Sequence, residues 1–444
     1  MGLIHKLAQI LEESEAAYLQ SKSATYNKVE CFGAHEKRDQ NLLAYGDNLS
    51  WMNYLKQEAG LEGKLQLIYV DPPFYSKADY FTSVKIESEE LTESVKIKQT
   101  VYTDTWDNGM EDYLRMIAIR LFAMRDLLSE EGCIWVHLDW HVAHYVKILM
   151  DEIFGEDNFV NEIIWNYKSG GSSNRRFSRK HDTLLFYSKT DEYYFNPQKE
   201  KSYNRGFKPY RFKGVSEYED EQGWYTLVNM KDVWQIDMVG RTSAERTGYA
   251  TQKPEALLSR IMESCTRAGD LCADFFGGSG TLAAVASQMN RRWISCDMGA
   301  SSIGNIQNRL LSASVDFSFY MQESQHDREE EGTLQVNLQI GSIDEVAFAE
   351  VTLLDYQPPK SWMERLSPKD QNLIDNILKK DSISLLEFWS IDINYNGTVH
   401  QPQRIIFKTK GCLERQIAIH DTMAVIHIVC VDVFGNRTVK AING

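Results

Sequence analysis

The chain has 444 residues, with 63 Asp and Glu against 48 Lys and Arg and a formal net charge of −15. This length allows two or three domains with a large core, which excludes a small fold that depends on disulfides or a metal. No apolar run of about 18 residues and no signal peptide occur, so we expect a soluble, cytoplasmic protein without a membrane span. The seven cysteines lack metal-ligand spacing, so we expect reduced thiols and no bound metal.

The N-terminal part predicts a helix and then a buried strand. Apolar residues from Leu3 to Leu19 recur at a spacing near 3.6, which predicts a helical lead-in. Farther along, the apolar run 67–70 ends in Asp71-Pro72-Pro73-Phe74, which predicts a strand that opens into a rigid loop. The loop offers a carboxylate, proline carbonyls and an aromatic face, which suit a planar ring with an exocyclic amine. A purely structural turn explains the same residues equally well, so a second motif has to decide.

The next elements alternate between helix and strand. We predict a helix over 113–128, a strand over 132–138 and a further helix through Met150. Three histidines fall in this part, and we assign them to a strand end and a helix face rather than to a metal site: His137, His141 and His144. Residues 170–174, with the sequence Gly-Gly-Ser-Ser-Asn, predict a flexible loop.

A basic stretch surrounds that loop. Between Asn161 and Val215, 12 Lys and Arg stand against 5 Asp and Glu, and aromatic residues are interleaved with them. Phosphate contacts require Lys and Arg, so this stretch is where an acidic chain could bind nucleic acid. An ordinary basic surface would have the same composition.

The second motif is a glycine-rich turn. An apolar run over 271–276 precedes Gly277-Gly278-Ser279-Gly280-Thr281, and a helix-forming segment follows over 282–286. Strand, glycine turn and helix form the arrangement that receives a nucleotide-like cofactor in α/β proteins. A second strand over 293–296 ends at Asp297, at the separation of about 20 residues from the turn where an acid commonly reaches ribose hydroxyls. A plain packing turn would not require that acid.

The two motifs together resemble those of the amino-group DNA methyltransferases. In that family an Asp-Pro-Pro-aromatic loop is catalytic and a Phe-x-Gly-x-Gly turn binds S-adenosylmethionine. The segments 46–49 (Gly-Asp-Asn-Leu) and 251–255 (Thr-Gln-Lys-Pro-Glu) resemble two further elements of the family. Because the catalytic loop precedes the cofactor turn, the chain is most similar to the beta group, which includes type III modification subunits and stand-alone adenine methyltransferases. The resemblance covers residues 40–310.

The resemblance implies an α/β, Rossmann-like S-adenosylmethionine-dependent methyltransferase fold with a circularly permuted motif order. It also implies an inserted target-recognition region, and the sequence adds a small C-terminal β-rich domain, for which strands over 403–408 and 424–433 and turns at 396–397 and 435–436 are predicted. The expected divisions are a helical lead-in (1–35), a catalytic part (36–165), a target-recognition insertion (166–248), a cofactor-binding part (249–320), an acidic linker (321–335) and the C-terminal domain (336–444).

Site residues and partners follow from the same resemblance. The expected catalytic residues are Asp71, Pro72, Pro73 and Phe74. The expected contacts to S-adenosylmethionine are Asp47, Lys253, Phe276, Gly277, Gly278, Ser279, Gly280, Thr281 and Asp297. The expected DNA contacts are Lys168, Arg175, Arg176, Arg179 and Lys180. The implied partners are double-stranded DNA read sequence-specifically, a second copy of the chain in a homodimer, and a restriction subunit if the protein belongs to a restriction-modification system.

The chain departs from the family pattern at three positions. Phe275 stands where proline is usual, Gly277 where alanine is common, and Phe74 where tyrosine is commoner. Each change keeps the apolar or stacking surface, so we still expect methyl transfer to the N6 of an adenine extruded from the duplex.

Other functions stay open or are excluded on specific residues. Cytosine N4 methylation uses the same scaffold, and Asp71 favours adenine only moderately. Residues 278–283 also satisfy the G-x-G-x-x-A fingerprint of NAD-dependent oxidoreductases, but such an enzyme has no use for the Asp-Pro-Pro-Phe loop. A cytosine C5 methyltransferase needs a cysteine after proline, and no cysteine in the chain follows one. A DNA-binding module without activity would not need an intact catalytic loop.

Overall fold

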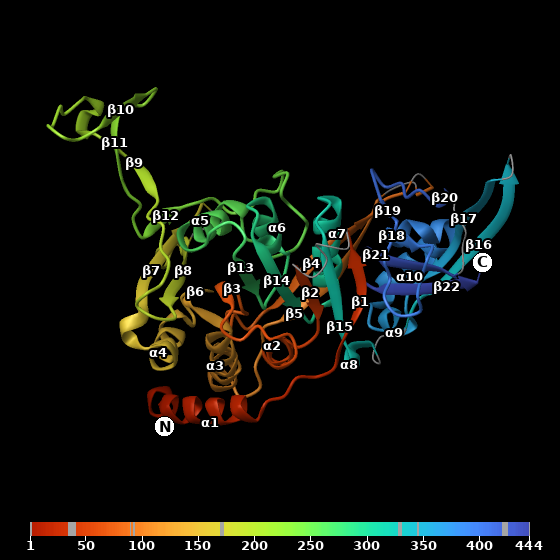
Figure 1. The fold of residues 1–444 in the computed structure, drawn as a ribbon, viewed down its shortest axis with the longest axis horizontal. Coiled ribbons are helices and arrows are strands. Elements are labelled where there is room, and N and C mark those ends of the chain that lie inside the picture. The colour runs from red at the N-terminus through yellow and green to blue at the C-terminus, as the bar shows by residue number, and fades with distance from the viewer. Residues whose placement is uncertain are drawn as a thin grey trace.

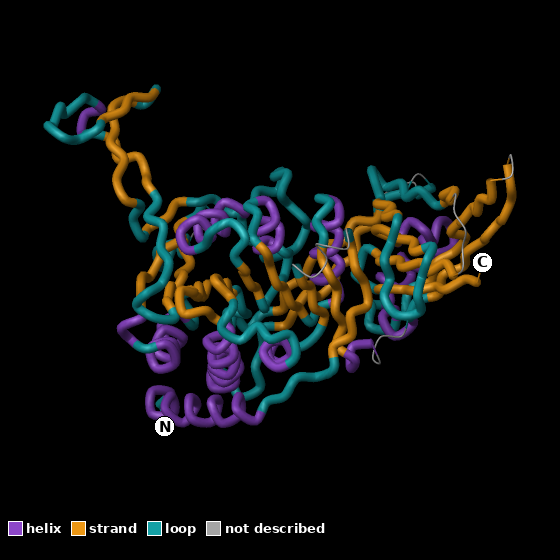
Figure 2. Tube along the Cα trace, viewed as in Figure 1, coloured by secondary structure: helices purple, strands orange, loops and turns teal. Residues whose placement is uncertain are grey.

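The computed structural model describes residues 2–33, 41–88, 90–91, 94–168, 173–326, 331–343, 346–419 and 425–443. A ten-stranded sheet with helices on both faces forms the larger part, and a smaller β-rich unit follows it at the C-terminal end (Figure 1). Figure 2 shows the same division, with helices flanking the strands of the larger part. Among the described residues, no helix has the length and apolar character needed to cross a membrane.

The central sheet has the strand order β1-β15-β2-β14-β13-β3-β6-β8-β7-β12. Its six strands from β15 to β6 run parallel, and antiparallel pairs flank them. The strands are β1 (Tyr26–Phe32), β2 (Leu42–Tyr45), β3 (Leu65–Val70), β6 (Leu128–Leu138), β7 (Phe159–Asn166), β8 (His181–Ser188), β12 (Val233–Gln235), β13 (Leu271–Asp274), β14 (Arg292–Asp297) and β15 (Phe317–Gln322). Every residue of β3 is buried, as expected for a strand covered on both faces. The strands predicted over 67–70, 132–138 and 293–296 are confirmed.

The strands β3 and β13 mark a switch point in this sheet. Leu67 of β3 lies opposite Cys272 of β13, although the two strands are far apart in the chain. From β3 the chain crosses to β6 on one side, and from β13 it crosses to β14 on the other side. Loops that leave two neighbouring strands in opposite directions open a crevice at the carboxyl ends of the strands. The loop after β3 is the Asp-Pro-Pro-Phe segment, and the loop after β13 is the glycine-rich turn.

Helices cover both faces of the sheet (Figure 1). One face carries α1 (Leu7–Gln20, after a 3₁₀ turn at Leu3–Lys6), α2 (Asn48–Gln57), α3 (Met110–Leu127) and α4 (Ala143–Phe154). The other face carries α5 (Glu255–Cys265), α6 (Thr281–Gln288) and α7 (Ala300–Ser312). The helix α1 packs against α3, and the buried residues of α3 and α6 lie in the core beside the sheet, which explains why the periodicity of 113–128 and 282–286 predicted these two helices correctly.

Two expected divisions cut through the central sheet. The lead-in 1–35 contains β1, which pairs antiparallel with β15 as an edge strand. The insertion 166–248 contains β8 and β12, which both belong to the central sheet. Within the described part of the insertion, the three-stranded sheet of β9 (Lys199–Tyr203), β10 (Glu217–Asp220) and β11 (Gly223–Asn229) projects from the body, at the upper left of Figure 1. Sequence periodicity is local, and it does not say which sheet a short strand joins.

A hairpin that the sequence analysis missed follows the catalytic loop. It consists of β4 (Asp79–Ile86) and β5 (Val95–Thr103), which pair antiparallel. Ile86 and Ile97 at its far end are fully buried in the core of the C-terminal unit. The Gln99 side chain donates from Nε2 to the carbonyl of Phe434 at 3.0 Å. The hairpin therefore joins the catalytic loop to the C-terminal unit.

The C-terminal unit has two sheets, β16-β17-β20 and β19-β18-β21-β22. Its elements are β16 (Thr333–Ile343), β17 (Val346–Gln357), α9 (Lys360–Met363), α10 (Pro368–Asp381), a 3₁₀ turn (Ser382–Leu385), β18 (Leu386–Asp392), β19 (Arg404–Phe407), β20 (Gln416–Ile419), β21 (Val425–Asp432) and β22 (Arg437–Asn443). The segment expected to be a linker contains the end of β15, a short helix α8 (Glu323–His326) and the start of β16, and residues 327–330 lie outside the described residues.

Candidate active site

A cavity of about 500 Å³ opens at the carboxyl ends of β3, β13 and β14. We call it the edge cavity. Of the predicted catalytic and cofactor residues, the cavity is lined by Asp71, Pro72, Pro73, Phe74, Lys253, Phe276, Gly277, Gly278, Ser279, Thr281 and Asp297. Two motifs that are far apart in the sequence therefore meet in one cavity, because their strands are neighbours in the sheet.

The two carboxylate oxygens of Asp71 have different surroundings. Oδ2 accepts a hydrogen bond from the ammonium of Lys253, and both side chains are mostly buried, at 18% and 11% exposed. Oδ1 is buried and has no hydrogen-bond partner among the described residues. The Lys253 ammonium also lies 5.3 Å from the centre of the Phe74 ring. One oxygen of Asp71 is therefore held by a cation, and the other is available to a donor that enters the cavity.

A buried histidine lies behind Asp71. The His137 ring is fully buried, with Nε2 3.2 Å from Asp182 Oδ2 and Nδ1 2.7 Å from the Tyr69 hydroxyl. Burial tends to raise the pKa of Asp182, but hydrogen bonds from His137 and Tyr167 leave that pKa below its usual value. Since Asp182 can only accept when ionised, we assign a proton to His137 Nε2, and in that tautomer Nδ1 accepts from the Tyr69 hydroxyl.

This arrangement places no proton donor opposite the free oxygen of Asp71. Asp71 Oδ1 lies 4.0 Å from His137 Nδ1, which is too far for a hydrogen bond. In the tautomer whose Nδ1 accepts from Tyr69, the His137 ring packs beside the loop and donates no hydrogen bond to Asp71. The histidine predicted to line a strand end therefore supports the loop from behind.

Asp104 fixes the chain that continues from Phe74. Its fully buried carboxylate accepts from the Tyr75 N–H at 3.1 Å, the Ser76 N–H at 2.6 Å and the Trp106 indole N–H at 3.0 Å. Tyr75 and Lys77 both have φ of +58°, a left-handed conformation that side chains disfavour. The four-residue motif gave no sign of this clamp, because Asp104 lies beyond the β4–β5 hairpin.

The glycine-rich turn needs its glycines for two reasons. A Cβ on Gly277 would lie 2.5 Å from Ser295 Oγ, so a side chain there would require Ser295 on β14 to move. Gly280 has φ of +71° and forms the N-cap of α6. The turn is also tied to the Lys253 segment, because Thr281 Oγ1 donates to the Lys253 carbonyl at 3.1 Å.

Two further carboxylates lie at the base of the edge cavity. Asp297 accepts from the backbone N–H groups of Gly278 and Gly299, both at 2.8 Å. Burial raises the pKa of Asp297 despite these bonds. Burial raises the pKa of Asp274 to about 8, and its Oδ1 accepts from the Phe276 N–H at 2.9 Å. Asp274 is therefore mostly protonated at neutral pH.

Aromatic side chains from outside the two motifs form much of the cavity wall. Tyr80 and Tyr102 come from the β4–β5 hairpin and stack with ring centroids 4.7 Å apart. Trp106 and Tyr249 line the same cavity. These residues were not predicted from the sequence, in which the density of aromatic residues after Phe74 is the one sign of a cavity wall.

Asp47 occupies a different place from the one expected. Its carboxylate caps α2 by accepting from the Ser50 N–H at 2.9 Å, and it pairs with Arg120 at 3.0 Å. Its neighbours Gly46 and Asn48 line the edge cavity, whereas Asp47 is not among the lining residues. The geometry therefore assigns Asp47 to holding α2 and Arg120, and the expected cofactor contact stays a prediction.

The residues expected to contact DNA lie on the same edge of the sheet as Asp71. The β6–β8 and β7–β8 registers pair Leu138 with Thr183 and Asn166 with His181, so the loop between β7 and β8 leaves the sheet at the carboxyl end of β6. Arg175 and Arg176 on that loop are exposed. Lys168 is 77% exposed beside Asp237, Arg179 lies 3.4 Å from the Trp140 ring centre, and Lys180 is half-buried. Residues 169–172 of the predicted flexible loop lie outside the described residues.

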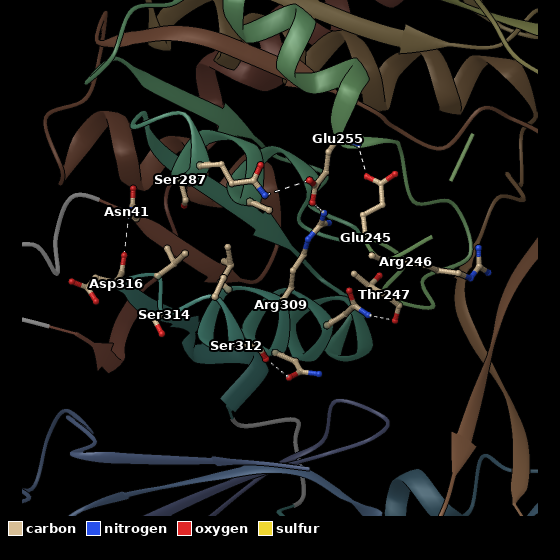
Figure 3. Close-up of a pocket in the computed structure, with 18 of the residues that line it drawn as sticks. Asn41, Glu245, Arg246, Thr247, Glu255, Ser287, Arg309, Ser312, Ser314 and Asp316 are labelled. Atoms are coloured by element: carbon tan, nitrogen blue, oxygen red, sulfur yellow. Dashed lines mark hydrogen bonds and ion pairs between the residues drawn. The ribbon is translucent and has the colours of Figure 1, made fainter. Parts of the chain in front are cut away.

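A second cavity of about 840 Å³ lies over α5, α6 and α7, and we call it the helical groove (Figure 3). It contains none of the sequence-predicted site residues. Arg309 reaches Glu255 at 2.6 Å, and the Glu255 N–H donates to Glu245 at 2.9 Å. Arg309 also donates to the Ser279 carbonyl at 3.0 Å, so the groove supports the glycine-rich turn from behind. Arg246 points away from this cluster in Figure 3.

The chain is similar in sequence to known DNA methylases. A family model described as DNA methylase matches residues 65–308, more than half of the chain. The chain is 28% identical over 195 residues to the type III restriction-modification enzyme EcoP15I Mod subunit of Escherichia coli, a match that covers 42% of this chain and 29% of that subunit. It is 25% identical over 375 residues to the type II methyltransferase M.EcaI of Enterobacter cloacae, covering 70% of this chain and 78% of that enzyme. A solved structure, the M1.HpyAVI–SAM complex, is similar with 17% identity and a TM-score of 0.38 over 61% of this chain and 98% of that chain.

Proposed function

This chain belongs to the DNA methylase family, and from that premise we propose that it transfers a methyl group from S-adenosylmethionine to the N6 of an adenine extruded from duplex DNA. The observation that carries the proposal is the meeting of the Asp71–Phe74 loop and the Phe276–Thr281 turn in one cavity. The first loop suits an aromatic ring with an amine, and the glycine-rich turn suits a cofactor. Placing both ligands in one cavity brings them close enough to react with each other.

The residues of the edge cavity fit S-adenosylmethionine. The volume of about 500 Å³ lies within the range of about 300–1,000 Å³ typical of small-molecule sites. The first N–H groups of α6 follow the glycine turn and suit the carboxylate of the cofactor, and Asp297 suits its ribose hydroxyls. Asp71 and the surrounding aromatic rings provide the negative and π-rich surface that a sulfonium prefers. When bound, the cofactor supplies an electrophilic methyl group.

The Asp71 loop then positions the acceptor amine. Phe74 stacks on the extruded ring, while Asp71 Oδ1 and the Pro72 carbonyl accept hydrogen bonds from the two N–H groups of the amine. These hydrogen bonds direct the nitrogen lone pair out of the ring and towards the methyl carbon. A new N–C bond forms as the S–C bond breaks, and the nitrogen then loses one proton.

Lys253 leaves one oxygen of Asp71 for the amine. Its ammonium donates to Oδ2, so Oδ1 is the oxygen that can accept from the ring amine. We therefore assign Asp71 to orienting and polarising the amine. Lys253 thereby acts as a positioning residue for Asp71 in addition to its predicted place beside the cofactor.

Cytosine N4 is the alternative acceptor on the same scaffold. Its exocyclic amine would meet the same Asp71 oxygen and Pro72 carbonyl, so the geometry of the amine site does not separate the two bases. The first residue of the loop is Asp rather than Ser, which favours adenine.

The experiment that tests the proposal is expression in cells that lack their own adenine methylation. The genomic DNA is sequenced by a method that detects modified bases, and the nucleosides are analysed in parallel. We expect N6-methyladenine at one recurring motif, and none in cells that express Asp71→Ala. N4-methylcytosine at a recurring motif would show that the acceptor base is cytosine rather than adenine. If cells with folded protein contained neither modified base, the proposed reaction would be refuted.

We further propose that the enzyme acts in the compartment that holds the DNA, as a homodimer, and that a restriction subunit accompanies it. The last point is supported by the similarity of this chain to Mod subunits of type III restriction-modification enzymes, although the match covers less than a third of each subunit. Co-purification of a tagged chain with the products of neighbouring genes tests for the subunit, and light scattering of the purified protein tests for the dimer.

A further inference from the structure

Phe177 is the most exposed large apolar side chain in the described part of the molecule, at 97%. Burying such a side chain stabilises a folded protein by about 1.5–3 kcal/mol, and the exposed Phe177 does not contribute this stabilisation. The neighbouring Arg175 and Arg176 are exposed as well, and neither forms an ion pair within the described chain. An apolar ring and two unpaired cations at one loop tip are unexplained by the folding of this chain.

The loop that carries Phe177 is anchored beside the reacting edge. Its last residues return to β8, where Asp182 contacts His137, and His137 lies 4.0 Å from Asp71. Phe177 is five residues before Asp182, so its Cα lies within about 17 Å of that residue even if the chain is fully extended. The Phe177 Cα therefore lies within about five base-pair steps of Asp182, on the same edge of the sheet as Asp71.

The base of the loop is held in place. The Tyr167 N–H donates to the Lys180 carbonyl at 3.0 Å, which closes the loop. The guanidinium of Arg179 lies 3.4 Å from the Trp140 ring centre, and Trp140 stacks on His141 at 3.7 Å. Because Arg179 contacts Trp140, the exposed residues 175–177 are next to a part of the loop that is held against the body.

These features match a known requirement of the proposed reaction. Extruding a base leaves a gap in the stack and costs a few kcal/mol. Proteins that distort duplexes insert apolar side chains between base steps, and flanking arginines hold the adjacent phosphates. We propose that Phe177 enters the DNA stack at the position that the extruded adenine leaves, an inference that rests on the proposed function. Arg175 and Arg176 then bind the phosphates on either side.

The test compares Phe177→Ala with the wild type on two duplexes that carry the recognition motif found by genomic sequencing. In the first duplex the target base is paired, and in the second it faces an abasic site, so that extrusion is already easy. We expect the single-turnover methylation rate of the variant to fall about 10- to 100-fold on the paired duplex, because the lost insertion is worth a few kcal/mol. On the abasic duplex we expect a rate close to that of the wild type.

Two further variants complete the design. Phe177→Leu keeps an apolar wedge and should retain most of the rate on the paired duplex. Leu19→Ala removes an apolar side chain that is 75% exposed on α1, outside the regions assigned to DNA, and should leave both rates unchanged. Fluorescence of 2-aminopurine at the target position should rise on binding of the wild type and less on binding of Phe177→Ala.

Each outcome decides one of the two claims. Equal losses on both duplexes, or no loss on the paired duplex, would overturn the insertion of Phe177. A wild-type protein that methylates neither duplex would overturn the proposed function instead. Thermal unfolding of Phe177→Ala should match the wild type, because the ring contacts almost nothing in the folded chain.

Discussion

The edge cavity and the helical groove differ in how their charged side chains are paired, although the neutral Asn305 of the groove also has a buried oxygen without a partner among the described residues. The groove is larger, at about 840 Å³ against about 500 Å³, yet Arg309, Glu255 and Glu245 bond to one another inside it. The edge cavity instead leaves Asp71 Oδ1 buried without a partner among the described residues. It also keeps Asp274 protonated by burial, with a pKa of about 8.

This difference distinguishes a reactive site from a structural depression better than size does. Charges that pair within a surface stabilise the fold and leave nothing for a ligand. A buried acceptor without a partner costs free energy, which a ligand can recover on binding. The same contrast predicts where substitutions affect chemistry and where they affect only the fold.

The largest expected effect is the loss of activity in Asp71→Ala. Removing the acceptor for the amine should lower the methylation rate on the order of a thousandfold or more. The dissociation constant for S-adenosylmethionine should stay nearly the same, as measured by calorimetry. Gln288→Ala in the helical groove is the matched control and should keep full activity. Parallel loss of cofactor binding in Asp71→Ala would contradict the assigned role.

The next expected effect is on DNA affinity, which should depend on the loop that carries Arg175 and Arg176 and not on the helical groove. Reversing both charges with Arg175→Glu and Arg176→Glu should weaken DNA binding on the order of a hundredfold at low salt and reduce the salt slope by about two. Fluorescence anisotropy over a salt series measures both quantities. Arg246→Glu, an exposed arginine at the helical groove, should change neither. If Arg246→Glu weakens binding as much, DNA also covers the groove.

A smaller effect concerns the cofactor. Asp297→Ala should raise the dissociation constant for S-adenosylmethionine about 10- to 100-fold, because a charge-assisted hydrogen bond contributes about 1.5–3 kcal/mol. Thermal unfolding measured alongside separates this effect from the loss of the bonds to Gly278 and Gly299. An unchanged dissociation constant in a folded variant would refute the ribose contact.

The last expected effect concerns stability rather than activity or binding, and it is a pH dependence that is small over any one pH unit. Burial raises the pKa of Asp274 from 3.8 to about 8, so the folded chain holds a proton that the unfolded chain releases above pH 3.8. This contribution to stability is complete below pH 3.8 and is lost as the pH rises towards 8. Asp274→Asn cannot ionise, so its stability relative to the wild type should increase by about 1.4 kcal/mol per pH unit across that window. Urea unfolding at several pH values measures the difference, and parallel curves for the two proteins would contradict the buried proton.

Local patterns predicted the elements that carry the site. The apolar run before Asp71 and the strand–turn–helix around Gly277 are confirmed, because these features depend on neighbouring residues. The β4–β5 hairpin was missed, although it supplies Tyr80 and Tyr102 to the cavity and reaches the C-terminal core. Its residues follow the proline loop without a strong turn signal, and its stability depends on contacts with distant parts of the chain.

The sequence by itself determined the two motifs and, by resemblance, the chemistry that they imply. Only the tertiary structure decided which side chains meet: that Lys253 pairs with Asp71, that Asp104 clamps the loop after Phe74, and that Asp47 caps a helix beside the cavity. The physical reason is that strand order brings residues together across long separations in the chain. Periodicity reports which face of an element is buried, but it carries no information about the partner on the other side.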